Sequence, residues 1–130
     1  MALDITSFME QQLETAVVEI CNPNSGEPLG VKITLASPDS GKYRTASLAI
    51  QNRQLQYSMK NRGRSISAER LEENALELLI EATLDWEGLV EDGRELACTP
   101  ENVRRVYQNM PFIREQVDEF LGDRRNFFRN

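Results

Sequence analysis

Few side chains in this sequence are of the types that carry out catalysis. The chain contains no histidine, the commonest general base and metal ligand of proteins. Its two cysteines, Cys21 and Cys98, lie far apart and lack the paired spacing of a structural zinc site. Acids are plentiful, but Glu72, Glu73, Glu77 and Glu81 are spaced as one solvated flank of a helix. Phosphate-loop, dinucleotide-binding, nucleophile-elbow and zincin motifs are all missing from the sequence. We therefore expect no enzymatic activity, no cofactor and no metal.

The length and composition are typical of one soluble domain. The chain has 130 residues, of which 40% are hydrophobic and 28% charged, and a chain of this size buries roughly two-thirds of its unfolded surface on folding. No apolar run approaches the ~18 residues that a membrane-spanning helix needs, and the N-terminus lacks the pattern of an export signal. We expect a single domain over residues 1–130 in a reducing cytoplasm, with Cys21 and Cys98 as small buried side chains rather than a disulfide.

Charge is divided unevenly along the chain, whose formal net charge is −6. Residues 39–64 contain six Lys or Arg against one acid, a balance of +5, whereas residues 69–101 contain eleven acids against two Arg, a balance of −9. Such blocks can attract one another within a chain or between copies of it, or can be solvated faces. Basic residues cluster at Lys60, Arg62 and Arg64, but the acidic half would repel a phosphate backbone, so nucleic acid is not the expected partner.

Two segments near the N-terminus have the alternating pattern of β-strands. In residues 16–20 and 31–35, apolar side chains occupy every second position. The segment NPNSGEPLG connects them, so the pattern predicts a hairpin over residues 15–35 with a long loop. An isolated hairpin is only marginally stable, and its apolar face must pack on helices or on another copy of the chain. For the first dozen residues, periodicity does not distinguish a short helix from a loose segment.

The sequence pattern of residues 38–62 predicts a long helix with apolar residues on two opposite sides. Ser37 is a candidate N-cap, Pro38 takes the first helical position, and Gly63 ends the helix. At 100° per residue, one stripe consists of Ala46, Ile50 and Tyr57. The opposite stripe consists of Leu48, Leu55 and Met59. One stripe suffices for packing on a single core, so the second needs a partner of its own, either in the same fold or in another molecule. We predict that this second stripe is a partner-binding or oligomer surface.

The next helix is expected to be central to the fold. Ser67 is a candidate N-cap with acids in the first turn, where they favour the helix dipole. The segment AERLEENALELLIEATLDW continues the helical pattern to Trp86, and Gly88 ends it. Apolar residues occupy two faces of this helix, which predicts that it lies between other elements.

Two short helices are expected to follow. A weak hairpin around Asp92 and Gly93 precedes them. Residues 99–101, Thr-Pro-Glu, are a strong helix start, and Pro111 begins the last helix, which stops at Gly122. Together, the patterns predict a mainly α fold of the α+β class, with about four helices over residues 38–128 and the small N-terminal β-hairpin.

The C-terminal stretch GDRRNFFRN mixes arginines with aromatic residues, a composition found in segments that bind single-stranded nucleic acid. It follows a helix with a glycine stop, so we expect a short return segment in which Phe127 and Phe128 pack on the domain or on a neighbouring subunit. Its arginines are then expected to reach carboxylates of the acidic block. The residues assigned to this electrostatic contact are Arg124, Arg125, Glu73 and Glu77.

Three segments occur in a distinctive order along the chain. ITLASPDS is followed closely by Tyr43 and Arg44, then comes EATLDWEGL with Trp86, and lastly TPENVRRVYQNMPFIREQVDEFLGDRRNFF. Together they resemble the tail assembly chaperones of long-tailed bacteriophages, which are small, mostly helical proteins with a modest N-terminal β element. The resemblance covers roughly residues 15–128 and includes no catalytic signature.

The resemblance implies a binding protein that acts in the host cytoplasm during virion assembly. Such chaperones coat the long tape measure protein, help to recruit major tail protein subunits around it, and leave before the tail is complete. Family members often occur also in a longer, frameshifted form. Self-association is expected, and no membrane partner is. The alternative is a structural component of the virion, such as a head-tail connector or tail completion protein, which the same size, acidity and charge division would suit.

Overall fold

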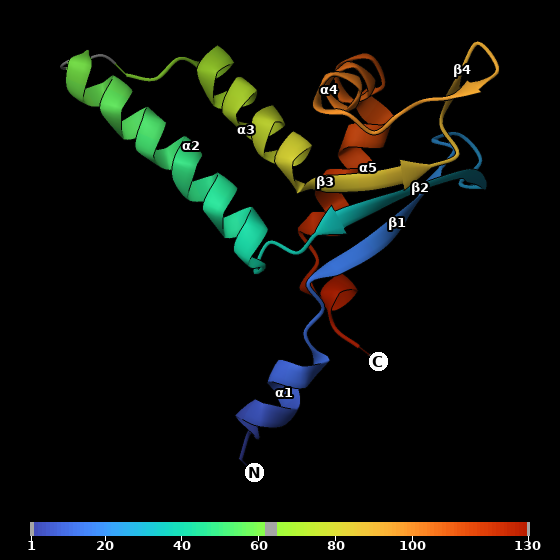
Figure 1. Cartoon of the computed structure of the whole chain (residues 1–130), viewed down its shortest axis with the longest axis horizontal. Coiled ribbons are helices and arrows are strands. Elements are labelled where there is room, and N and C mark those ends of the chain that lie inside the picture. Colours follow the sequence, from blue (N-terminus) through green and yellow to red (C-terminus); the bar gives the residue numbers. More distant parts are fainter. Residues whose placement is uncertain (1, 62–64, 130) are drawn as a thin grey trace.

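The computed structural model describes residues 2–61 and 65–129. In that part of the chain, five α-helices accompany a three-stranded antiparallel sheet and a separate two-stranded hairpin (Figure 1). The helices are α1 (Ile5–Gln11), α2 (Gly41–Lys60), α3 (Ala68–Ala82), α4 (Pro100–Asn109), α5 (Pro111–Leu121) and the short 3-10 helix η1 (Arg124–Phe127). The strands are β1 (Thr15–Cys21), β2 (Pro28–Ala36), β3 (Thr83–Glu87), β4 (Val90–Glu91) and β5 (Arg94–Glu95). The predicted α+β class is confirmed, but α1 raises the number of helices above the expected four.

The predicted N-terminal hairpin is formed by β1 and β2. The two strands pair in antiparallel register, and β2 is the central strand of the sheet because β3 pairs with its other edge. The alternation in the sequence places Val18 and Ile20 of β1, and Ile33 and Leu35 of β2, in the core, while Lys32 is exposed on the opposite face. The apolar face of the hairpin is therefore covered within the same chain.

The third strand corrects the predicted extent of the central helix. The helix α3 ends at Ala82, and the chain continues as β3, in which Trp86 lies opposite Ile33 of β2. The hydroxyl of Thr83 donates a hydrogen bond to the carbonyl of Leu79 at 2.8 Å, one turn back in the helix. The prediction of a helix to Trp86 was wrong because the apolar spacing of this segment fits a helix, whereas pairing with β2 satisfies its backbone groups in a strand.

The start of α2 also differs from the prediction. The N-cap is Ser40, whose hydroxyl oxygen accepts from the backbone N–H of Tyr43 at 3.3 Å. The expected cap, Ser37, is buried in the preceding turn, where its carbonyl accepts from the hydroxyl of Ser40 at 2.6 Å. Pro38 therefore lies in the turn before the helix. At the other end α2 stops at Lys60, and the expected stop at Gly63 lies outside the described residues.

The helices α3, α4 and α5 build the core together with one face of the sheet. In Figure 1, α5 lies behind the sheet, α4 lies above the strands, and α3 lies between α2 and α4. The buried helical side chains are Leu76, Leu79 and Ile80 of α3, Val103, Val106 and Tyr107 of α4, and Ile113, Val117 and Leu121 of α5. The central position predicted for α3 is confirmed, since α3 packs between α2 and α4. One of its apolar faces enters the core through Leu76 and Ile80, whereas Leu71 of the other face is exposed.

The remaining turns follow their sequence signals. Thr99 caps α4 by accepting from the backbone N–H of Asn102 at 3.3 Å, with proline in the first helical turn as predicted. The predicted hairpin at Asp92 and Gly93 is the β4–β5 pair, and both turn residues have a positive φ.

Both cysteines are free thiols, as expected, but they are only partly buried, and Cys98 packs against the core. Within residues 2–61 and 65–129, no helix has the length and apolar character needed to cross a lipid bilayer.

Candidate partner-binding surface

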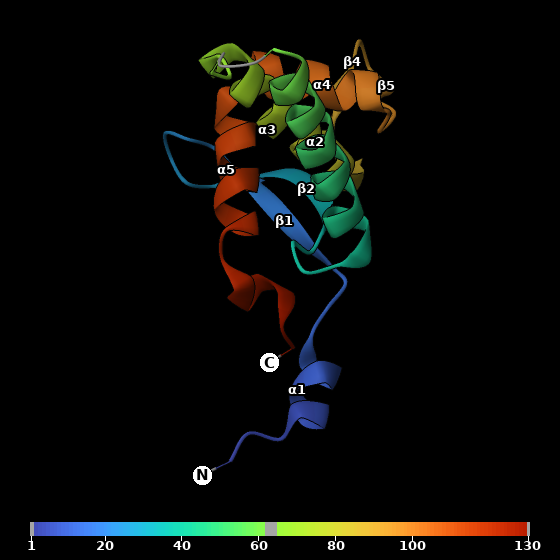
Figure 2. The same ribbon diagram turned by 90° about the vertical axis from the view of Figure 1, so that its left-hand side faces the viewer.

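The long helix α2 forms the outer edge of the molecule. It runs antiparallel to α3, which lies between it and α4, as Figure 1 shows. Figure 2 shows α2 on the opposite side of the molecule from α5 over most of its length. The first predicted stripe faces α3 and is partly buried there; it consists of Ala46, Ile50 and Tyr57. The guanidinium carbon of Arg70 on α3 lies 3.8 Å from the ring centroid of Tyr57, which adds a cation–π contact to this packing. No residue of α2 is fully buried, so the helix adds a layer to the core rather than belonging to it.

The second predicted stripe points away from α3 and lies on the protein surface. The exposed fractions are 57% for Leu48, 60% for Leu55 and 69% for Met59. These three residues span about 16 Å along the helix at 1.5 Å per residue. We call them the α2 face. Scattered exposed apolar residues are ordinary, but an aligned set on one helix is typical of a surface that binds a partner.

The charges on α2 are of one sign. Its twenty residues include Lys42, Arg44, Arg53 and Lys60 and no acid. Arg53 is paired with Glu77 of α3, whereas Lys42, Arg44 and Lys60 form no ion pair with any residue in the described part of the chain. The α2 face is therefore an apolar stripe on a basic helix, and it suits a partner with acidic residues beside its own apolar ones.

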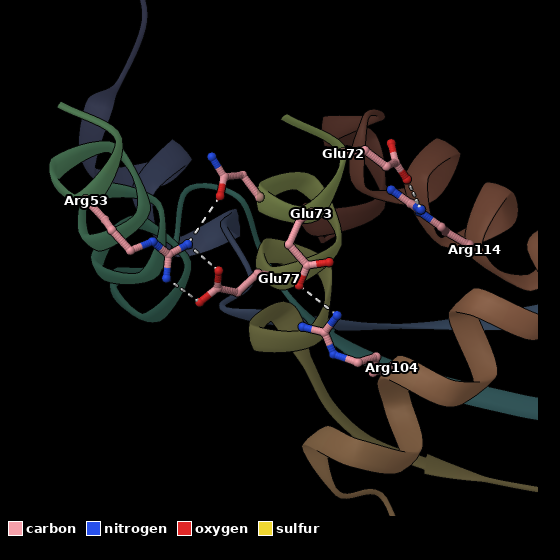
Figure 3. Close-up of polar contacts among 7 residues, drawn as sticks. Arg53, Glu72, Glu73, Glu77, Arg104 and Arg114 are labelled. Atoms are coloured by element: carbon pink, nitrogen blue, oxygen red, sulfur yellow. Dashed lines mark hydrogen bonds and ion pairs between the residues drawn. The ribbon is translucent and has the colours of Figure 1, made fainter. Parts of the chain in front are cut away.

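Glutamates of α3 form ion pairs with arginines of the neighbouring helices α2, α4 and α5 (Figure 3). Glu77 pairs with Arg53 of α2, Glu73 with Arg104 of α4 at 2.7 Å, and Glu72 with Arg114 of α5. Hydrogen bonding from Arg53 lowers the pKa of Glu77, against the opposing effect of its partial burial. Each pair is partly exposed and contributes little by itself. Together they show that the basic and acidic blocks attract one another at these points inside the chain.

The predicted partners of Arg124 and Arg125 were wrong. Arg124 makes two hydrogen bonds to the carboxylate of Asp39, at 2.9 and 3.2 Å, and these lower the pKa of Asp39. Arg125 binds Asp123, two residues earlier in the chain. Both arginines lie just after the C-terminal end of α5, and Glu73 and Glu77 pair instead with Arg104 and Arg53.

The C-terminal segment packs on its own chain. Phe127 is 3% exposed, and its ring meets that of Phe120 edge to face with 5.5 Å between centroids. Phe128 is half-buried, and its backbone forms a β-bridge with Gln12. The prediction that this segment folds back is confirmed for Phe127 and in part for Phe128, and Phe127 in particular offers no free surface to a partner.

A second exposed apolar surface consists of α1 and Leu3 just before it, where periodicity alone had left the structure open. The exposed fractions are 66% for Leu3, 67% for Ile5, 46% for Phe8 and 67% for Met9, and no residue of α1 is buried. Figures 1 and 2 show α1 projecting from the rest of the molecule. Ile5, Phe8 and Met9 share one side of the helix through their i, i+3 and i+4 spacing. This spacing was the signal in the sequence for a second binding surface.

A cavity of about 460 Å³ lies between the start of α2 and α5. Its lining is mainly apolar and includes Tyr43, Leu78 and Leu121, with Asp118 and Arg124 at the polar positions. Burial raises the pKa of Asp118, and the nearby guanidinium of Arg114 opposes this shift. The described residues contain no group of three or more Asp, Glu, His or Cys side chains placed to hold a metal ion. The apolar surfaces of α1 and α2 are thus the more prominent candidates for function.

Comparison of the chain with protein-family models, with curated proteins and with solved structures gives no match.

Proposed function

We propose that this protein is a tail assembly chaperone of a long-tailed bacteriophage. It binds the tape measure protein in the host cytoplasm, helps to recruit major tail protein, and carries out no reaction. The order of three sequence segments motivates this proposal, and the α2 face is the structural observation that supports it.

The α2 face has the properties that a chaperone of a long helical client requires. Its three side chains are exposed along one line on an outer helix, so an extended client can lie against them without entering a pocket. Met59 is flexible and polarisable, and it adapts to apolar side chains of different shapes. Placing a leucine from this face against a client contributes about 1.5–3 kcal/mol when the side chain becomes fully buried.

The basic charge of α2 adds selectivity to this apolar contact. Lys42 and Lys60 stand near the two ends of the helix, where they would attract client segments that carry acids beside their apolar residues. We therefore expect the bound segments of the tape measure protein to be amphipathic and acidic. Binding should weaken as ionic strength rises, because exposed charges are screened.

Co-expression with the tape measure protein of the same genome tests the proposal. We expect the soluble fraction of that client to rise and the two proteins to co-purify, compared with expression of the client alone. A client that stays insoluble and does not co-purify would contradict a chaperone function.

The presence or absence of the protein in the finished virion distinguishes a chaperone from the alternative, a structural component of the virion. A chaperone leaves before the tail is complete, whereas a connector or tail completion protein remains. Mass spectrometry of purified virions should therefore detect the major tail protein and not this chain. Its presence in stoichiometric amount would favour the structural component.

A further inference from the structure

The N-terminal arm, residues 2–11, is not covered by any part of the chain that the structure describes. Four of the eleven large apolar side chains that are exposed in the described part of the molecule lie within residues 3–9. The helix α1 has only seven residues, whereas isolated helices shorter than about 12–15 residues are marginal in water. A partner that covers Ile5, Phe8 and Met9 would stabilise the helix and remove this apolar surface from water.

The backbone holds the arm away from the body of its own chain. The carbonyl of Gln11 accepts from the N–H of Arg129 at 2.8 Å, and the N–H of Leu13 donates to the carbonyl of Phe127 at 2.7 Å. The carbonyl of Glu14 accepts from the N–H of Ser37 at 2.9 Å. These bonds fix the chain directly after α1, so the arm projects outward in both views (Figures 1 and 2). The described part of the chain therefore leaves the arm free to contact another molecule.

The charge of the arm indicates which surface of a second copy could cover it. The arm contains Asp4 and Glu10 and no Lys or Arg, whereas α2 contains four Lys or Arg and no acid. Two arms would repel one another, and so would two α2 helices, while an arm and an α2 helix attract. Both surfaces are also apolar along one side.

The dimensions of the two surfaces agree. At 1.5 Å per residue, α1 is about 10 Å long, and the α2 face extends over about 16 Å. The arm can therefore lie wholly on the α2 face, with its acids beside the basic flanks of that helix.

We infer that the N-terminal arm of one copy of this chain docks on the α2 face of a second copy. The arm and the face are different patches, so the contact is heterologous, and copies join head to tail into a ring or an open chain. The inference concerns the protein without any client and does not depend on the proposed function.

Two single substitutions, each in one of the two patches, test this contact. Phe8→Ser damages the arm and leaves the face intact, and Leu55→Glu damages the face and leaves the arm intact. Light scattering after size exclusion, over a range of concentrations up to ~1 mM, measures the mass of each protein. We expect the wild-type mass to rise with concentration and each variant alone to associate at least about tenfold more weakly, because each loses a buried apolar side chain.

A mixture of the two variants distinguishes this contact from other modes of association. The intact arm of the Leu55→Glu copy can bind the intact face of the Phe8→Ser copy, and growth must then stop, so we expect a 1:1 dimer. Gln56→Glu, which adds the same charge beside the α2 face, is the matched control for the added charge and should weaken association much less than Leu55→Glu does. The inference would be overturned by a wild type that stays monomeric up to ~1 mM, by variants that associate as it does, or by a mixture that gives either monomers or larger assemblies.

Discussion

The hydroxyl of Tyr107 on α4 lies 2.6 Å from the hydroxyl of Thr83, where α3 becomes β3. Thr83 donates its only hydroxyl proton to the carbonyl of Leu79 at 2.8 Å, so Tyr107 is the donor in the bond between the two hydroxyls. Both residues are buried. The bond fixes α4 against the point where α3 ends and the chain enters the sheet as β3, and α3 in turn packs on α2. This pair therefore contributes to the position of the α2 face.

Tyr107 makes stability sensitive to alkaline pH. Burial raises the pKa of Tyr107 to about 12 from the ordinary value of 10.0. Between pH 10 and 12 the hydroxyl of Tyr107 loses its proton in the unfolded chain but keeps it in the folded chain. The contribution of this group to the free energy of unfolding is therefore complete below pH 10 and is lost as pH rises toward 12. At pH ~11 the free energy of unfolding should have fallen by about 1.4 kcal/mol from this group alone. Urea unfolding of wild type and Tyr107→Phe at pH ~8 and ~11 should show a smaller fall for the variant; equal falls would contradict the assignment.

Gly88 permits a close approach of two backbones at the edge of the sheet. Its φ is +86°, and a Cβ placed there would lie 2.0 Å from the carbonyl oxygen of Gly30. Gly93 has a φ of +79° but open space around it, so Gly93→Ala measures backbone strain alone, about 1–2 kcal/mol. We expect Gly88→Ala to lower the free energy of unfolding by a further 1–3 kcal/mol or so because the strands must separate. Equal effects of the two substitutions in urea unfolding would show that the close approach has no energetic consequence.

The two C-terminal phenylalanines should differ in their effect on stability. Phe127→Ala leaves a cavity beside Phe120 and should cost about 3–5 kcal/mol. Phe128→Ala removes a half-buried ring and should cost about 1–2 kcal/mol, because the backbone bridge to Gln12 remains. Thermal unfolding of the two variants compares them directly. A larger loss of stability for Phe128→Ala than for Phe127→Ala would show that Phe128 is the side chain that anchors the segment.

Local patterns in the sequence were sufficient to predict those elements whose signals lie within a few residues of one another. The hairpin of β1 and β2, the cap at Thr99 and the turn at Asp92 and Gly93 follow from alternation, capping and turn chemistry. The strand β3 could not be predicted in this way, because its extended form depends on pairing with β2, about fifty residues earlier. At the start of α2, Ser37 and Ser40 are both capable caps, and only the buried turn between them selects Ser40.

The candidate surface was predictable in part. Helical periodicity alone separated Leu55 and Met59 from the residues that face α3, and the structure places both on the surface. Charge partners were less predictable, since Arg124 binds Asp39, 85 residues away, and not the acids of α3. Counting charges identifies blocks of opposite sign, but the helix geometry decides which side chains meet.

The most direct test of the α2 face as a partner-binding surface compares Leu55→Glu with Gln56→Glu in co-purification with the tape measure protein. Both residues are exposed on α2, so both variants should keep the wild-type helix content and a free energy of unfolding within about 0.5 kcal/mol. We expect Leu55→Glu to reduce the recovered client at least about tenfold, because a charge replaces an apolar contact, and Gln56→Glu to recover nearly the wild-type amount. Full recovery of the client by a folded Leu55→Glu variant would show that the α2 face does not bind the client.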